Sequence, residues 1–328
     1  MRAGSGVPHS AHADWLRAAE GEIRFAWWSH HFLWMLLGGL VAGVFSAMTL
    51  NGMAANEARA FEDTVSDARA NGVDVDAELH APIHVQVNGN STTIDNPVRY
   101  DYDRARNALG MLRPAGYSAN AAQVAGFLLA PLVAFGAGLA LSVKDFRLRT
   151  IRVRAVRSRL GALESAYALT AGLEGIATVI GAIAAALATG VLTAGPTSSA
   201  LVLDGLEPVP DTAGPGGVAA WTCFAVVAAL FFGTVGVAAG LLTRALIAPM
   251  GVFTAFHLMV PILGPLDPRA MVLSVGTALA PLSGTLQLRP ISGALPTTWN
   301  VIILVAQAIV LLLLARIALA IRPRWGGP

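Results

Sequence analysis

Two ionisable residues, Glu174 and Arg244, lie at the ends of long apolar segments, where a charge has to be accommodated. A charged side chain in a bilayer costs about 3 kcal/mol or more unless it meets a partner or water. Glu174 could therefore form an ion pair with Arg244, or with an arginine of the basic segment 144–159 that precedes it. Alternatively, a cytoplasmic helix runs on to Gly172, and Glu174 stays in contact with water. The wet interpretation is slightly favoured.

His257 is the other polar residue that could act inside an apolar segment, where it lies between Pro249 and Pro261. Such a histidine either lines a cavity on a transport pathway or packs in the core. Packing is favoured, because lone polar groups in helix bundles usually find a neighbour.

Motifs for catalysis or nucleotide binding are absent from the sequence. The only lysine, Lys144, lies in SVKDF, so the chain has no GxxxxGK[ST] loop, and it contains no HExxH, GxSxG or CxxC. His80 and His84 have the spacing of two metal ligands on a helix, but Pro82 lies between them, which favours a solvated pair. We expect no catalytic residue, no metal site and no enzyme activity on this chain.

Apolar segments dominate the 328 residues: 55% are hydrophobic and 13% charged, whereas a soluble domain has about 25% charged residues. Mean hydropathy is +0.61. A transmembrane helix needs about 20 apolar residues. We predict six spans, at 32–50, 121–143, 175–194, 217–242, 245–266 and 298–321, with a seventh candidate at 270–288.

Charge places the connecting segments, because Lys/Arg-rich loops stay cytoplasmic. The run KDFRLRTIRVRAVRSR, 144–159, is basic, whereas the connection 51–120 has ten acids and six arginines and is predicted outside. With six spans, both termini are cytoplasmic. The seventh candidate then becomes a re-entrant or interfacial hairpin in an outer segment 267–297, broken near Pro281 to Gly284.

The N-terminal segment 1–31 is predicted to contain an amphipathic interfacial helix. Leu16, Ala19, Ile23 and Trp27 fall on one stripe, and Asp14 is a plausible N-cap. This helix is either an elbow that moves with a cytosolic partner or a passive anchor, and both interpretations stay open.

The connection 51–120 is too long for a simple turn. Its sequence predicts a helix at 61–70, a strand in IHVQVNG that ends in an Asn-Gly turn, and a helix at 101–112. The result is a small mixed extracytoplasmic loop. It either gates an outer opening or is an ordered loop, and the second is favoured.

Two further patterns leave alternatives open. The cytoplasmic loop 144–165 would form an amphipathic helix that either lies on anionic lipid or docks a cytosolic motor. Gly39-x3-Gly43 and Gly236-x3-Gly240 present small faces for close helix packing, within the chain or across a dimer seam.

The predicted fold class is an all-α polytopic membrane protein with one transmembrane domain, 32–328. One lysine against 21 arginines, with abundant Ala and Gly, indicates a high-GC bacterial genome, so we expect a multi-pass protein of the bacterial cell membrane. The basic residues gather in loops and report topology and lipid contact, so no nucleic acid is expected as a partner.

The layout resembles the permease subunit of ABC-2 type transporters. The similar parts are GEIRF before the first span, the loop KDFRLRTIRVRAVRSRLGALES, the broken stretch GPLDPRAMVLSVGTALAPLSG and the closing TTWNVIILVAQAIVLLLLARIALAIRPR. The long acidic outer loop departs from the compact pattern of that family.

The resemblance implies an ATP-driven exporter with a second permease subunit, alike or different, and with ATP and Mg held by separate ATPase chains. It assigns coupling to the ATPase to Lys144, Arg147, Arg149, Arg152, Arg154, Arg157 and Arg159. The apolar faces favour a lipid-like, drug-like or peptide substrate.

Two other classes of protein compete with this one. The chain could be a membrane anchor or assembly factor that transports nothing and binds an envelope partner through 51–120. An intramembrane enzyme would need paired acids or a Ser/His arrangement at one depth, and none is found among the six spans.

Overall fold

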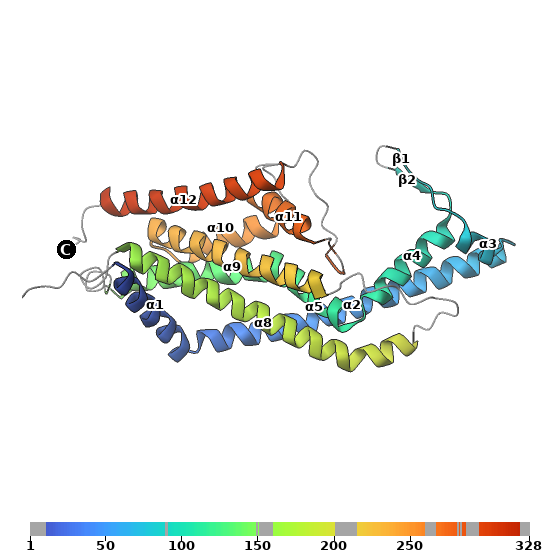
Figure 1. Ribbon diagram of the computed structural model, residues 1–328, viewed down its shortest axis with the longest axis horizontal. Coiled ribbons are helices and arrows are strands. Elements are labelled where there is room, and N and C mark those ends of the chain that lie inside the picture. The colour runs from blue at the N-terminus through green and yellow to red at the C-terminus, as the bar shows by residue number, and fades with distance from the viewer. Residues whose placement is uncertain are drawn as a thin grey trace, which may run out of the picture.

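The structure is a computed structural model that describes residues 11–88, 91–148, 150, 160–200, 215–259, 267–280, 282, 284–286 and 295–321. Helices run along a common long axis, and a small outlying unit stands at one end (Figure 1). The main helices are α1 (Ala11–Trp28), α2 (His31–Ala70), α5 (Pro114–Val124), α6 (Ala130–Arg147), α8 (Leu160–Ala200), α9 (Pro215–Thr243), α10 (Ile247–Leu258), α11 (Pro268–Leu279) and α12 (Thr297–Ile321).

Five helices of the described residues are long and apolar enough to cross a membrane, and they match five of the six predicted spans. The remaining prediction, 245–266, overlaps α10, which has 12 residues and is about 18 Å long. That length is below the ~30 Å of a hydrocarbon core. Residues 260–266 lie outside the described part, so this span stays a prediction.

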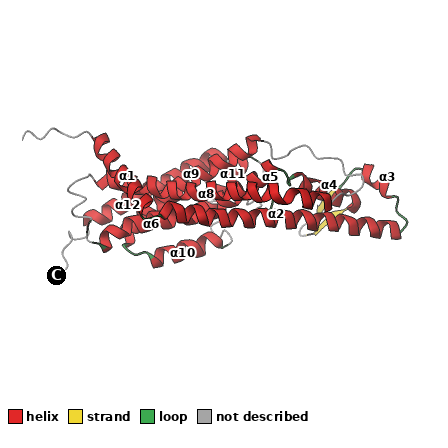
Figure 2. Cartoon of the chain, turned by 90° about the horizontal axis from the view of Figure 1, so that it is seen from below, coloured by secondary structure: helices red, strands yellow, loops and turns green. Residues whose placement is uncertain are grey.

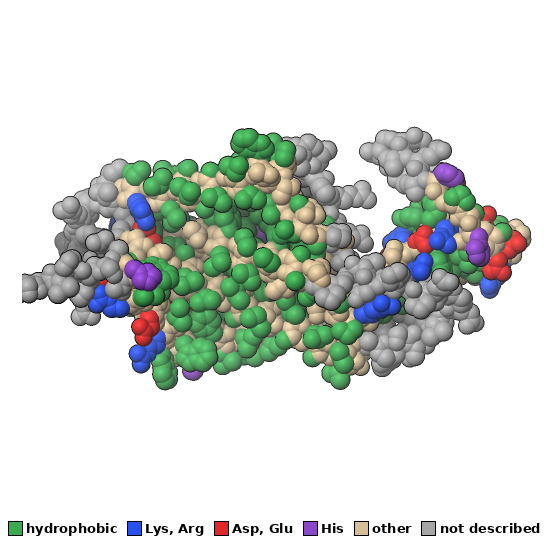
Figure 3. Space-filling view, in the orientation of Figure 1, with side chains coloured by type: hydrophobic (Ala, Val, Ile, Leu, Met, Phe, Trp, Pro, Cys, Tyr) green, Lys and Arg blue, Asp and Glu red, His purple; other side chains and the backbone are tan. Residues whose placement is uncertain are grey.

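Charge is distributed as a membrane protein requires. In the space-filling view, hydrophobic side chains cover the middle of the bundle, and most of the visible charged side chains lie at one end of the bundle and on the outlying unit (Figure 3). The chain is thus a largely α-helical, multi-pass membrane protein.

Two helices, α2 and α8, extend furthest beyond the predicted spans. The first span and the predicted helix 61–70 form one continuous helix, α2, because the connecting residues 51–60 contain no proline and only one glycine, Gly52. At 40 residues it is about 60 Å long, twice the hydrocarbon thickness, so its charged second half extends beyond the bundle (Figure 2). Likewise, α8 begins at Leu160, well before the predicted start at 175.

The outlying unit matches the predicted elements of 51–120. Around the end of α2 lie α3 (Val75–His80), an antiparallel hairpin of β1 (Val85–Asn88) and β2 (Ser91–Ile94), and α4 (Pro97–Gly110). Phe61, Val98, Tyr102 and Ala105 form its small hydrophobic cluster. The predicted helix 101–112 begins earlier, at Pro97, because Asn96 caps it and Pro97 fits a first helical position.

His84 belongs to the base of this hairpin. Its backbone N–H donates to Asp95 Oδ1 at 2.7 Å, and this bond holds the pKa of the Asp95 carboxyl below its usual value. The His84 ring lies 2.8 Å from Asp95 Oδ2, and both His80 and His84 are exposed, as the solvated interpretation expected.

At the N-terminus, α1 begins at Ala11, so the prediction of Asp14 as N-cap is wrong; Asp14 pairs with Arg17 one turn later. The buried face of α1 consists of Ala18, Ala19, Glu22 and Ala26, whereas Leu16 and Trp27 of the predicted stripe are exposed. The chain then turns into α2 at His30, which has a left-handed backbone (φ 60°).

The broken segment before the last span is helical over α11, whose N-cap is Asp267 and which ends at Leu279. The chain is extended at Ala280 and turns at Gly284 (φ 82°), so the predicted break near Pro281 to Gly284 lies where the helix stops. Whether this segment re-enters a bilayer stays a prediction.

Close packing between spans relies on glycine. A methyl group on Gly39 or Gly43 would collide with the backbone of Thr178 or Ala182 on α8, and one on Gly236 would collide with the Phe135 carbonyl on α6. Both glycine pairs therefore serve contacts within the chain, which is one of the two predicted alternatives.

Gly39→Ala should destabilise the protein by about 1–3 kcal/mol, because the new methyl forces α2 away from the Thr178 carbonyl. Gly38→Ala is the matched control, since nothing lies within 4 Å of a methyl at that position. The midpoint of thermal unfolding in detergent, followed by size-exclusion chromatography, measures both. Equal midpoints for the two variants would contradict the assigned α2–α8 contact.

Candidate functional site

Ionisable side chains form pairs towards the end of the bundle where α1, the start of α2, the last turn of α6, the first half of α8 and the end of α12 lie (Figure 2), and the acidic member of each pair is buried. We call this set the ionic cluster. It consists of Glu22, His31, Lys144, Asp145, Glu164, Tyr167, Glu174 and Arg316.

Glu22 and Lys144 form the pair that ties α1 to α6. The Lys144 Nζ atom lies 2.8 Å from Glu22 Oε2, and the glutamate side chain is completely buried. The ammonium also lies 3.6 Å from the centre of the Phe25 ring, a favourable cation–π position. The first residue of the predicted coupling set is thus engaged in the bundle.

The rest of that set divides into two. Arg147 is exposed in the last turn of α6. Arg149, Arg152, Arg154, Arg157 and Arg159 lie outside the described residues.

Asp145 fixes the chain as it leaves α6. Its buried carboxylate accepts a hydrogen bond from the Tyr167 hydroxyl of α8 and another from the Thr150 hydroxyl at 2.9 Å. The Thr150 backbone N–H donates to the Asp145 carbonyl at 3.0 Å. The start of the basic segment is therefore held against α8.

Glu164 joins α8 to the last helix. Arg316 Nε donates to Glu164 Oε2 at 2.8 Å, with the glutamate buried and the arginine half exposed. Arg316, predicted only as a topology signal, is therefore also a structural contact.

Glu174 has a different partner from the predicted one. Its side chain is 1% exposed, so the favoured wet interpretation is wrong, and its Oε1 lies 3.4 Å from His31 Nδ1 at the start of α2. Arg244, the predicted partner, lies over the Phe146 ring with 5.0 Å between guanidinium carbon and ring centre, on a left-handed backbone (φ 55°). The missed signal was the pair His30-His31 at the opening of the first span.

His257 is packed, as favoured from the sequence. Its Nε2 donates to the Phe127 carbonyl at 2.9 Å, and its ring stacks on Phe253 with 5.4 Å between centres. In a regular α-helix the Phe127 carbonyl would accept a hydrogen bond from the backbone N–H of residue 131. Residue 131 is a proline and has no N–H, so His257 supplies the donor instead. The second span accordingly contains the π-helical turn η1 (Ala125–Leu129).

The opposite end of the bundle is held by a neutral polar contact that the sequence did not indicate. Asn120 of α5 is fully buried and donates to Ser46 Oγ of α2 at 2.8 Å. Its Oδ1 accepts from the backbone N–H and hydroxyl of Thr285, at 2.8 and 2.9 Å. One amide thereby joins three distant segments.

Arg269 was also missed. Its guanidinium donates to Asp267 Oδ2 at 2.7 Å and to the carbonyls of Phe256 and Met259 at the end of α10. Asp267 is fully buried and caps α11. The only signal was Asp-Pro-Arg before an apolar run, which is typical of a helix start.

No protein-family model, curated protein or solved structure matches this chain. The structure therefore defines only a broad class: a multi-pass helical membrane protein with an ionic cluster at one end.

Lys144→Met should cost about 3–5 kcal/mol of stability, because it leaves the Glu22 carboxylate buried without its ammonium. Arg17→Ala, at the exposed pair with Asp14, should cost no more than ~1 kcal/mol. The double variant Glu22→Gln/Lys144→Met should recover part of the loss, since it removes both charges. Thermal unfolding is measured for the natural protein, Arg17→Ala, Lys144→Met, Glu22→Gln and the double variant. A double variant that loses as much stability as Lys144→Met and Glu22→Gln together would refute the pairing.

Proposed function

We propose that this chain is the membrane-spanning permease subunit of an ATP-driven exporter of the ABC-2 type, working as a dimer with a separate ATPase chain in a bacterial cell membrane. The observation that carries the proposal is how the first residues of the basic segment are anchored in the bundle. Its first residue, Lys144, is bound to buried Glu22 of the surface helix α1, and Asp145 is bound to Tyr167 of α8.

This arrangement would suit a coupling device. A cytosolic motor that pushes the basic segment acts on α6 and α8 through covalent continuity, and on α1 through the Glu22–Lys144 pair. The pair Glu164–Arg316 passes the same displacement to α12. The last turn of the second span, the surface helix and the last span would then move together.

A second permease subunit is supported by apolar surface. In the most apolar 18-residue stretch of α2, only 28% is buried within the chain, and in the corresponding stretch of α12 only 17%. Lipid and a second subunit can both cover such faces. A lipid-like, drug-like or peptide substrate is proposed because an apolar pathway suits amphiphiles better than sugars or ions.

A non-transporting anchor or assembly factor is the second candidate, and the outlying unit favours it. The unit of α3, α4 and the hairpin stands clear of the bundle and has its own cluster around Phe61 and Tyr102 (Figure 1). Such a unit suits an envelope partner as well as a gate.

Replacing Arg152, Arg154 and Arg157 with Glu should abolish association with an ATPase without affecting membrane insertion, because reversed charge repels an acidic docking surface. Tagged full-length protein is purified in gentle detergent from its native host, and co-purified proteins are identified by mass spectrometry. We expect a stoichiometric ATP-binding protein with the natural sequence and none with the triple variant.

Arg59→Glu/Arg69→Glu is the matched control, because both arginines are exposed on the far half of α2. This variant should keep the ATPase. The permease proposal fails if no ATPase is recovered with the natural sequence. The anchor or assembly factor takes its place if the only proteins recovered are envelope proteins that the control variant fails to bind.

A further inference from the structure

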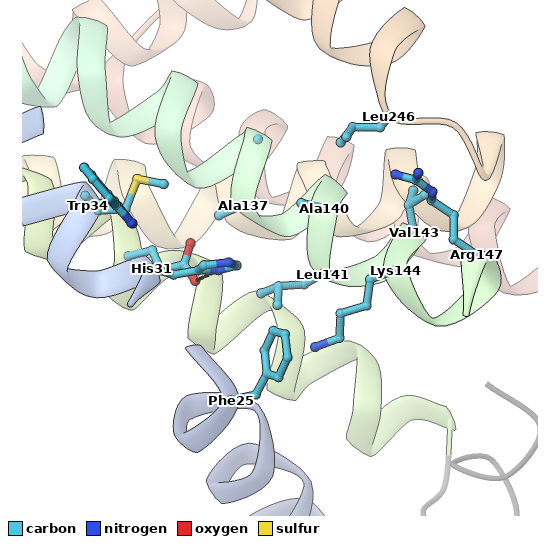
Figure 4. A pocket seen from close by; sticks show the side chains of 13 residues that line it. Phe25, His31, Trp34, Ala137, Ala140, Leu141, Val143, Lys144, Arg147 and Leu246 are labelled. Atoms are coloured by element: carbon cyan, nitrogen blue, oxygen red, sulfur yellow. Dashed lines mark ion pairs between the residues drawn. The ribbon is translucent and has the colours of Figure 1, made fainter. Parts of the chain in front are cut away.

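A cavity of about 430 Å³ opens beside the ionic cluster, between α1, α2, α6 and α8 (Figure 4). Its polar side is formed by His31, Lys144, Arg147 and Glu174. Its remaining walls are apolar and include Phe25, Trp34, Met35, Ala140, Leu141 and Val143. A cavity with one charged side and several apolar walls is shaped for an amphiphile.

At the cavity, the basic side chains are more exposed than the acidic side chains that they contact. Glu22 and Glu174 are 0% and 1% exposed, whereas Lys144 is 19% and His31 40% exposed. Arg147 is exposed, and within the described ranges no carboxylate is paired with it. A ligand entering the cavity therefore meets cationic donors before it meets a carboxylate.

Arg147 is the cation free to hold an anionic group. Lys144 points toward Phe25 and is engaged by Glu22, whereas Arg147 points the other way, toward Val143 and Leu246 (Figure 4). The Arg147 guanidinium has five N–H donors. A phosphate is a group that it binds strongly, through paired charge-assisted hydrogen bonds.

The depth of the cavity indicates where the anion comes from. Trp27 and Trp28 at the end of α1 and Trp34 at the start of α2 are 66–71% exposed, and tryptophan gathers at the level of lipid headgroups. From the cations, the wall continues into the apolar span along Met35, Ala140 and Leu141. A membrane phospholipid has this orientation, with its headgroup at the interface and its acyl chains parallel to the transmembrane helices.

We propose that this cavity is a binding site for an anionic phospholipid of the adjacent leaflet. Arg147 holds its phosphate, and an acyl chain lies along Ala140, Leu141 and Met35. The site does not depend on the proposed function, since it needs neither an ATPase nor transport.

The test is a titration of delipidated full-length protein in detergent with fluorescent phosphatidylglycerol and, separately, with fluorescent phosphatidylcholine. We expect saturable binding of phosphatidylglycerol, at least tenfold tighter than that of phosphatidylcholine. Arg147→Ala should weaken phosphatidylglycerol binding about tenfold through the lost charge-assisted hydrogen bonds and leave phosphatidylcholine binding unchanged. Ala140→Leu, which fills the apolar part of the cavity, should weaken both lipids.

Arg24→Ala is the matched control, because Arg24 is an exposed arginine of α1 that does not line the cavity. It should leave phosphatidylglycerol binding unchanged. The proposal is overturned by equal affinity for the two lipids, by an equal loss in Arg24→Ala, or by displacement of the lipid by a lipophilic ammonium or by glycerol phosphate at equal concentration. Thermal unfolding of each variant excludes a loss of fold as the cause.

Discussion

A carboxylate that leaves water has to find a cation or several donors, because its charge is poorly solvated by protein or lipid. Glu22, Glu164 and Asp267 are each nearly or fully buried. Their partners are Lys144, Arg316 and Arg269, respectively. Two of these pairs join helices that are far apart in sequence. They consequently select one arrangement of α1, α6, α8 and α12 among the many that apolar surfaces alone would permit.

Apolar surfaces alone specify little here, since lipid covers a leucine as well as another helix does. Close approach of backbones supplies the missing specificity. Along α2 the bundle side consists of Gly39, Gly43, Ser46 and Ala47, and the larger Phe45 and Met48 point outward. The small residues bring α2 against α8, and the neutral contacts of Asn120 then lock the far end of the same interface to the segment around Thr285.

Local pattern predicted the elements well, because hydropathy, caps and turn residues act over a few positions. The five long spans, the strand ending at Asn88 and the break after Leu279 follow from such signals. Helix lengths were underestimated, since charged residues continue a helix as readily as apolar ones once it leaves the membrane.

Partners at the site could not be predicted in the same way. Glu22 and Lys144 are separated by 122 positions and Asn120 and Thr285 by 165, and no local rule chooses between Arg244 and His31 as the neighbour of Glu174. His257 was the exception, because the favoured interpretation asked only that it pack against a neighbour, and Phe253 lies one turn away on the same helix.

The unbroken course of α2 has a mechanical consequence. His31 lies in the wall of the cavity, and Ala70 lies beside the outlying unit, with no proline, π-turn or other hinge between them. Over about 60 Å the helix is a stiff strut. A load applied to the hairpin at one surface of the membrane would therefore arrive at the cavity near the other surface as a tilt of the whole strut, with little of it absorbed along the way.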